Sequence, residues 1–190
     1  MLPANQIITE SLILRVPNKG DGESLYEAVS EMISKLRSEP DTWTWSSNHQ
    51  SIEASEEYCV RNYELWASGM KWPLLIIEKR SKKVLGMIEF YKRDFGWEVG
   101  AWSRPPRSIM KQSDFKLPSR GLMLEVVDAV TNYFIGYDRS TVVVMGIKSS
   151  NKAARRLVER GGCLWTGQYT NPERGNEVFE IYEGRYLEPG

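Results

Sequence analysis

The chain has 190 residues, 41% of them hydrophobic, and its 25 basic residues balance 25 acidic ones. This length fits one domain with one core, and zero net charge argues against general attraction to nucleic acid. No apolar run approaches the roughly eighteen residues of a membrane span, and the first residues lack a signal-peptide pattern, so we expect no membrane partner. Cys59 and Cys163 lie far apart in sequence, and we expect both as reduced, inert thiols in a cytoplasmic protein.

The first half of the chain predicts one strand, two helices and three further strands. Ser11 to Val16 alternates between apolar and polar residues and ends at Pro17, which is typical of a strand. Asp21 is expected to cap a helix that stops before Pro40, and a second helix is expected over about 51–68. Three strands separated by short polar turns are then expected to form an antiparallel meander: Trp72 to Glu78, Val84 to Arg93 and Gly96 to Ser103.

The second half predicts a long helix between two parallel strands, then a short helix and two more strands. The long helix is expected from about Ser119 to Ile135, with a buried stripe formed by Leu122, Val126, Val130 and Tyr133. The remaining predicted elements are a strand from Thr141 to Met145 buried on both faces, a helix from Asn151 to Arg160, and strands from Cys163 to Tyr169 and Glu177 to Tyr186. The fold class is therefore mixed α/β: one domain over residues 1–190 with its core at about 10–186.

The start of the long helix has features of an anion site. Ser119 is a good N-cap, and the first-turn N–H groups of Arg120, Gly121 and Leu122 would lack helical partners. Such groups and the helix dipole attract phosphate, and Gly121 permits close approach to the backbone. An ordinary capped helix is the simpler alternative, and the glycine spacing of a Walker loop or dinucleotide fingerprint is absent.

Two stretches are locally basic. Residues 104–120 and 148–160 each have a charge of +4, so the rest of the chain sums to −8. Both stretches begin a predicted crossover helix, so we expect them to face one site for a small polyanion at adjacent strand ends. The alternative is two solvated helix faces.

Several segments resemble the GCN5-related N-acetyltransferases, and within them the RimJ/RimL-type branch that acetylates ribosomal-protein N-termini. The matching segments occur in family order and cover roughly Glu10 to Tyr186; they are Ser11 to Arg15, Val84 to Ile88, Glu98 to Trp102, Ser119 to Glu125, Asn151 to Ala154 and Glu159 to Gly162. The ordered set carries the resemblance, because none of these motifs is very specific by itself.

The resemblance implies transfer of an acetyl group from acetyl-CoA to an amine, with no metal. The residues implied in holding the CoA pyrophosphate are Leu117, Ser119, Arg120, Gly121, Leu122 and Met123. Asn151 is implied near the pantetheine arm, and Glu98 is the implied general base. The sheet is expected to be mixed, mostly antiparallel and flanked by helices, and the strand bearing Glu98 is expected to splay from the Thr141 strand, with a bulge at Gly100.

Departures from the family pattern leave alternatives open. Ser119 replaces a glycine of the phosphate loop, and Ala154 and Val158 stand where the family places a serine or tyrosine that protonates the thiolate. Water or a hydroxyl such as Ser149 is the expected substitute. The protein is therefore expected to acetylate a protein N-terminus; the alternatives are a small amine such as an antibiotic or polyamine, or a CoA-binding module with weakened catalysis.

Other residues carry weaker expectations. His49 is expected as a solvated loop residue, and Trp43, Trp45 and Tyr91 as walls of the acceptor slot. The loop from Arg104 to Phe115 is expected either to cover the site or to mediate oligomerisation, for example as a homodimer.

Overall fold

The computed structural model describes residues 3–36, 48–94, 96–104, 121–137, 142–172 and 176–184. The chain divides into two compact units. The first comprises Met1–Glu89 and Ala101–Ser119, and the second comprises Phe90–Gly100 and Arg120–Gly190.

The described elements follow the predicted order closely. The first half of the chain contains β1 (Gln6–Ile8), β2 (Leu12–Arg15), α1 (Gly22–Leu36), α2 (Ile52–Ala67), β3 (Lys71–Glu78), β4 (Val84–Arg93) and β5 (Gly96–Ser103). The second half contains α4 (Leu122–Tyr137), β6 (Val143–Lys148), α5 (Lys152–Arg160), β7 (Leu164–Asn171) and β8 (Glu177–Gly184). Only the short strand β1 was not predicted.

The strands form one mixed sheet in the order β1-β2-β3-β4-β5-β6-β8-β7. β5 and β6 pair in parallel, as predicted for the strands on either side of the long helix. The pairs β1–β2, β2–β3, β6–β8 and β7–β8 are antiparallel. The predicted mixed, mostly antiparallel sheet is therefore confirmed.

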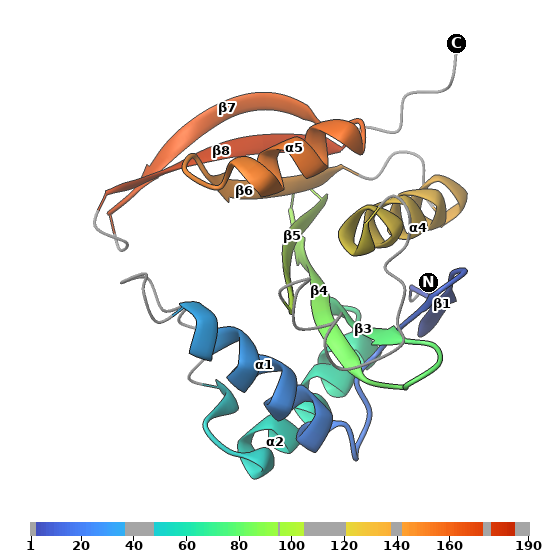
Figure 1. Cartoon of the computed structure of the whole chain (residues 1–190). Helices are drawn as coiled ribbons and strands as arrows, with labels where there is room; N and C mark the ends of the chain where they lie inside the picture. Colours follow the sequence, from blue (N-terminus) through green and yellow to red (C-terminus); the bar gives the residue numbers. More distant parts are fainter. Residues whose placement is uncertain are drawn as a thin grey trace. The chain divides into compact units, whose positions relative to one another are not determined.

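In the first unit, α1 and α2 lie side by side and bury one apolar face each (Figure 1). The core cluster joins these helices to β3 and β4 through Leu25, Val29, Cys59, Leu75 and Met87. The apolar spacing of α1 places its buried residues on one side, as the period of 3.6 residues requires.

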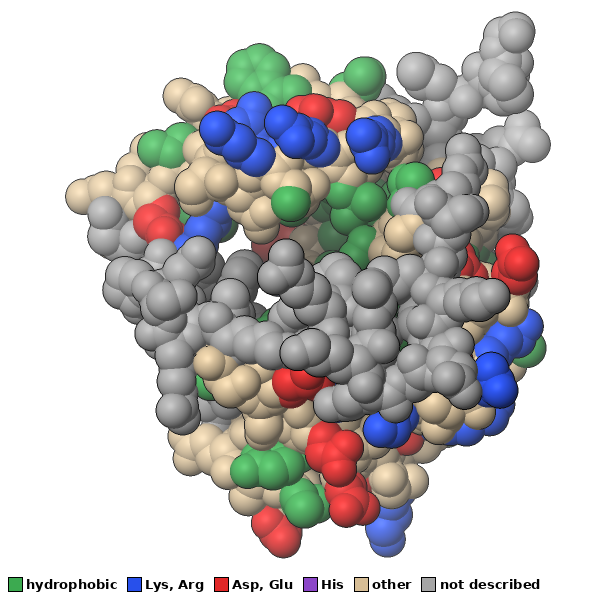
Figure 2. All heavy atoms as spheres, viewed as in Figure 1, with side chains coloured by type: hydrophobic (Ala, Val, Ile, Leu, Met, Phe, Trp, Pro, Cys, Tyr) green, Lys and Arg blue, Asp and Glu red, His purple; other side chains and the backbone are tan. Residues whose placement is uncertain are grey.

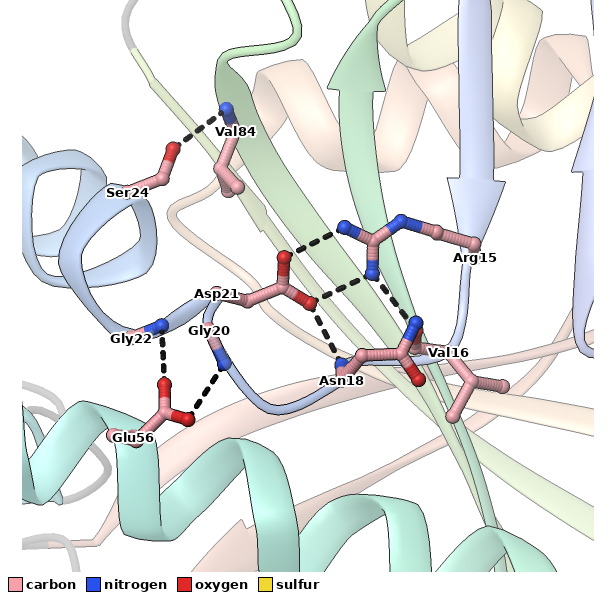
Figure 3. Close-up of polar contacts among 9 residues, drawn as sticks. All are labelled: Arg15, Val16, Asn18, Gly20, Asp21, Gly22, Ser24, Glu56 and Val84. Atoms are coloured by element: carbon pink, nitrogen blue, oxygen red, sulfur yellow. Dashed lines mark hydrogen bonds and ion pairs between the residues drawn. The ribbon is translucent and has the colours of Figure 1, made fainter.

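The start of α1 is held by a carboxylate from α2 (Figure 3). Glu56 accepts hydrogen bonds from the backbone N–H of Gly20 at 2.6 Å and of Gly22 at 2.9 Å. A Cβ at residue 22 would lie 2.7 Å from Glu56, so only glycine allows this approach. Asp21, predicted as the cap, directly precedes the helix: its carbonyl accepts from Leu25 N–H at 3.0 Å, while its carboxylate binds Arg15 through an ion pair at 2.6 Å. The first N–H group of α1, that of Gly22, is thus satisfied by a tertiary contact rather than by a local side chain.

In the second unit, α5 packs on one face of β6 and β8 (Figure 1). Ile147, Val158 and Tyr182 form the core of this contact. The prediction that the strand after the long helix is buried on both faces was wrong, because Met145 is only partly buried and Gly146 is exposed. This strand also starts two residues later than predicted, at Val143, and Thr141 lies outside the described residues.

Among the described helices, none is both long and apolar enough to cross a membrane.

Candidate active site

Glu98 lies on β5 within the short parallel ladder to β6. The register pairs Trp97 with Val143, Glu98 with Val144 and Val99 with Met145. Gly96 opens this strand with φ +133°, and a Cβ there would meet the carbonyl oxygen of Val142 at 2.3 Å. The glycine therefore permits the close approach that lets the two strands pair.

The ladder between β5 and β6 stops directly after Glu98 and Val99. Its last pair is Val99 with Met145, and the next positions, Gly100 and Gly146, are both glycines outside the ladder. A Cβ on Gly100 would meet only Tyr91, at 3.9 Å. The register between these two strands thus ends after three pairs, and the splay of the strands beyond this end stays a prediction.

The Glu98 carboxylate is held by an arginine from the neighbouring strand. Arg93 Nε donates to Glu98 Oε2 at 2.7 Å, and its terminal nitrogen lies 2.7 Å from the same oxygen. The side chain of Glu98 is 46% exposed. Glu98 is thus within reach of solvent and of a ligand, and its carboxylate is oriented by the guanidinium of Arg93.

The start of α4 differs from the prediction in its first residue. α4 begins at Leu122 rather than near Ser119, and its first backbone hydrogen bond runs from Glu125 N–H to the Gly121 carbonyl at 3.2 Å. The first-turn N–H groups without a partner inside the helix are therefore those of Leu122, Met123 and Leu124.

Gly121 precedes these donors with φ +92°, and a Cβ there would meet nothing within 4 Å. Among the described residues, the helix start thus combines donors that lack a helical partner with space around Gly121, which suits an anionic group. The predicted contacts Leu117, Ser119 and Arg120 lie outside the described residues, as do Trp43 and Trp45.

Asn151 is the N-cap of α5, directly after β6. Its side-chain oxygen accepts from Ala154 N–H at 3.1 Å. This bond fixes the amide group and turns its NH₂ group outward on an exposed residue. Asn151 can therefore donate to a ligand carbonyl without losing its structural role.

The family's positions for a thiolate proton donor hold no such group here. Val158 is buried in the core of the second unit, and Ala154 packs beside it. The Ser149 hydroxyl donates to Glu180 at 2.8 Å, and this bond helps hold the pKa of Glu180 below its usual range. The structure thus directs the Ser149 proton to Glu180.

The predicted convergence of two basic stretches on one site is weakened by local pairing. Lys148 forms an ion pair with Glu177 at 2.9 Å, and Arg155 donates to the Tyr182 hydroxyl at 3.2 Å. Arg104 pairs with Glu31 within the first unit at 3.3 Å. These three cations are therefore engaged with the protein itself.

Sequence reasoning missed a buried polar cluster in the first unit. Lys71 of β3 contacts Glu89 of β4 and donates to Asn62 at 2.6 Å, while the Tyr58 hydroxyl donates to Glu89 at 2.6 Å. His49 packs edge-on against Tyr58. The spacing of Tyr58 and Asn62 by four residues places both on one face of a helix, but it does not show which residues of β3 and β4 they contact.

The prediction that His49 is solvated was wrong. Its side chain is buried, its Nδ1 lies 3.0 Å from the Ser55 hydroxyl, and burial lowers its pKa to about 4. Burial likewise lowers the pKa of Lys71, against the opposing effect of Glu89. The shifted pKa values of His49 and Lys71 therefore both arise from tertiary contacts.

Both thiols behave as predicted. Burial raises the pKa of Cys59 to about 12 and that of Cys163 to about 11, and both are free cysteines. Neither is ionised near neutral pH, so neither is a nucleophile.

The comparisons with known proteins define the class. The profile of the Acetyltransferase (GNAT) domain family matches residues 11–164, and the chain belongs to this family. It is therefore an acetyltransferase by family, and two of the similar structures described next hold coenzyme A or acetyl-CoA. No sequence among the curated proteins matches the chain significantly.

Three solved structures show the same fold. RimL, a ribosomal L7/L12 alpha-N-protein acetyltransferase in complex with coenzyme A, is 17% identical over 95% of this chain and 97% of its own, with a TM-score of 0.76. The ribosomal-protein-S5-alanine acetyltransferase from Vibrio fischeri is 12% identical over 96% and 97%, with a TM-score of 0.75. The microcin C7 self-immunity acetyltransferase MccE, in complex with acetyl-CoA and AMP, is 15% identical over 93% of each chain, with a TM-score of 0.74.

Within the part of the chain that the structure describes, no three metal-ligating side chains cluster.

Proposed function

We propose that this protein transfers the acetyl group of acetyl-CoA to the α-amine of a protein N-terminus, with Glu98 as general base. The observation that carries the proposal is the position of Glu98, an accessible carboxylate where the β5–β6 ladder ends. Two of the similar structures act on ribosomal proteins, which supports a protein acceptor and the RimJ/RimL-type branch.

The chemistry requires a proton acceptor at this place. A protonated amine cannot attack a thioester, so Glu98 takes one proton from the ammonium, directly or through one water, before the N–C bond forms. As the tetrahedral intermediate collapses, the C–S bond breaks and the nitrogen releases its second proton to water. The CoA thiolate takes a proton from water, because Ala154 and Val158 supply none. The oxyanion of the tetrahedral intermediate requires a hydrogen-bond donor, and we propose a backbone N–H group near the end of the ladder for this role.

The proposed cofactor contacts rest on the start of α4 and on the family resemblance. The pyrophosphate lies against Gly121, Leu122 and Met123 at the helix start. The resemblance adds Leu117, Ser119 and Arg120, which lie outside the described residues. Asn151 donates to the pantetheine arm. The two units together form one catalytic domain over residues 1–190, and the reduced thiols support a cytoplasmic location.

The test is the release of free CoA from acetyl-CoA in the presence of peptides with free N-termini. Glu98→Gln is expected to lower kcat by about 10²–10⁴, the usual loss when a general base is removed. Glu64→Gln makes the same change on an exposed part of α2 and is expected to leave kcat unchanged. An N-terminally acetylated peptide, which has no free α-amine, is expected to release no CoA. Release of CoA with spermidine instead of the peptides would indicate a small-amine acceptor. Unaltered turnover in Glu98→Gln would remove Glu98 from the mechanism.

A second candidate is a CoA-binding module with weakened catalysis, favoured by Ala154 and by the burial of Val158 in the core. Calorimetric binding of CoA together with no transfer to any amine would establish it.

A further inference from the structure

One edge of α5 carries a straight row of basic side chains. Lys152, Arg156 and Arg160 recur every four residues, and all three are exposed. Figure 2 shows Lys and Arg side chains in a row over this helix. At a rise of about 1.5 Å per residue the row is about 12 Å long. We refer to these three residues as the α5 ridge.

The other charged residues of α5 turn toward the sheet. Arg155 donates to the Tyr182 hydroxyl and, at 3.2 Å, to the Ser149 carbonyl. Glu159, the one acidic residue of the helix, accepts from the Tyr182 hydroxyl at 2.8 Å. Within the described ranges, no ion pair joins a ridge residue to a carboxylate.

The ridge does not serve the stability of α5. Like charges four residues apart destabilise a helix. The helix is instead held by its Asn151 cap and by Val158 in the core. Because none of the three cations pairs with a carboxylate of a described residue, the ridge can serve as an interaction surface.

The size and surroundings of the ridge favour a short acidic protein segment over a nucleic acid. A single strand of B-form DNA advances about 3.4 Å per nucleotide, so the ridge spans only about four phosphates. The chain is neutral, so all residues outside the ridge sum to −3 and add no long-range attraction for a polyanion. A helix with carboxylates four residues apart, or a strand with carboxylates at alternate residues, repeats its charge every 6–7 Å, roughly the ridge spacing.

We propose that the α5 ridge docks an acidic segment of a protein partner. The bound segment lies along α5, with its carboxylates facing Lys152, Arg156 and Arg160. The proposal does not require that this partner be the acetylated protein, so it can fail or succeed separately from the proposed function.

The test measures binding of a fluorescent twelve-residue glutamate peptide by fluorescence anisotropy. The peptide is acetylated at its N-terminus, so it cannot act as an acetyl acceptor. Reversing the ridge with Lys152→Glu, Arg156→Glu and Arg160→Glu is expected to weaken binding by about tenfold or more, and added salt is expected to weaken binding to the unaltered protein.

The matched control reverses three exposed basic residues elsewhere: Lys19→Glu, Arg80→Glu and Lys92→Glu. It changes the net charge by the same amount, so an equal loss in both triple variants would assign binding to the overall field and overturn the proposal. A milder ridge variant, with Lys152, Arg156 and Arg160 all changed to Gln, guards against misfolding of α5 and is expected to lose binding as well.

Two further measurements decide what the ridge binds. A twelve-nucleotide uridine RNA is expected to bind more weakly than the glutamate peptide, and tighter RNA binding would overturn the proposal. The affinity for CoA, measured by calorimetry, is expected to be the same in the ridge variants and the unaltered protein. A loss of CoA affinity in the ridge variants would place the ridge in the cofactor site and would overturn the proposal. Failure of the unaltered protein to bind the glutamate peptide at low salt would overturn it as well.

Discussion

The protonation state of His49 in the first unit is set by burial. His49 lies against Tyr58 and beside the Ser55 hydroxyl, where charging its ring is unfavourable. Burial lowers its pKa to about 4, Glu89 opposes that shift and Arg61 adds to it. The neutral imidazole is thus part of the native packing, and its protonation competes with folding.

This state predicts a pH dependence of stability. The unfolded chain binds a proton at His49 near pH 6.5, while the folded chain does so near pH 4. The stabilising contribution of neutral His49 is therefore complete above pH 6.5 and falls as the pH drops toward 4, by at most about 3 kcal/mol. Urea denaturation at pH 7 and at pH 4 measures the change.

The matched variant for this prediction is His49→Gln, which cannot titrate. We expect it to lose less stability than the unaltered protein over the same pH range. Equal losses in the two proteins would show that His49 does not govern the acid sensitivity.

At the scale of elements, a buried ion pair joins the strands β3 and β4 of the first unit, and a hydrogen bond attaches helix α2 to it. Lys71 at the start of β3 and Glu89 on β4 are both largely buried, and Glu89 also accepts from Tyr58 of α2. Removing one partner leaves an uncompensated charge, which costs more than the intact pair contributes.

Lys71→Met is therefore expected to lower the free energy of unfolding by about 3 kcal/mol or more. The double variant Lys71→Met with Glu89→Gln is expected to recover much of this loss, because the neutral amide oxygen still accepts from Tyr58. Chemical denaturation of both variants measures the two values. If the double variant were no more stable than Lys71→Met, the buried charge would not be the cause.

For the molecule as a whole, acetyl-CoA is expected to bind the folded chain and so to stabilise it. A ligand at about one hundred times its Kd adds about 2.7 kcal/mol, which raises Tm by about 5–10 °C for a chain of this size. A thermal scan with increasing CoA tests this expectation, and a Tm that does not respond to CoA would contradict it.

The same scan tests the start of α4. Asn and Asp both tolerate the positive φ of Gly121 better than other side chains do. Only Asp adds a negative charge beside a bound diphosphate. Gly121→Asp is therefore expected to reduce the CoA-dependent rise in Tm clearly more than Gly121→Asn. Similar rises in the two variants would argue against a pyrophosphate at this helix start.

The sequence alone determined the order of most elements and the family. Periodic apolar residues, proline and glycine stops, and the Ser51 and Asn151 caps act through near neighbours in the chain, so their effect can be predicted locally. Motifs in family order added Glu98, Gly121 and Asn151 as candidates for the site.

Tertiary structure alone decided the partners of these residues. Arg93 beside Glu98, Glu56 at the start of α1, and Lys71 with Glu89 are contacts between different elements. The burial of His49 and the end of the β5–β6 ladder at Val99 have the same origin. Periodicity shows which face of an element is apolar, but it does not show which charged side chain of another element will meet it, because that depends on packing and strand register.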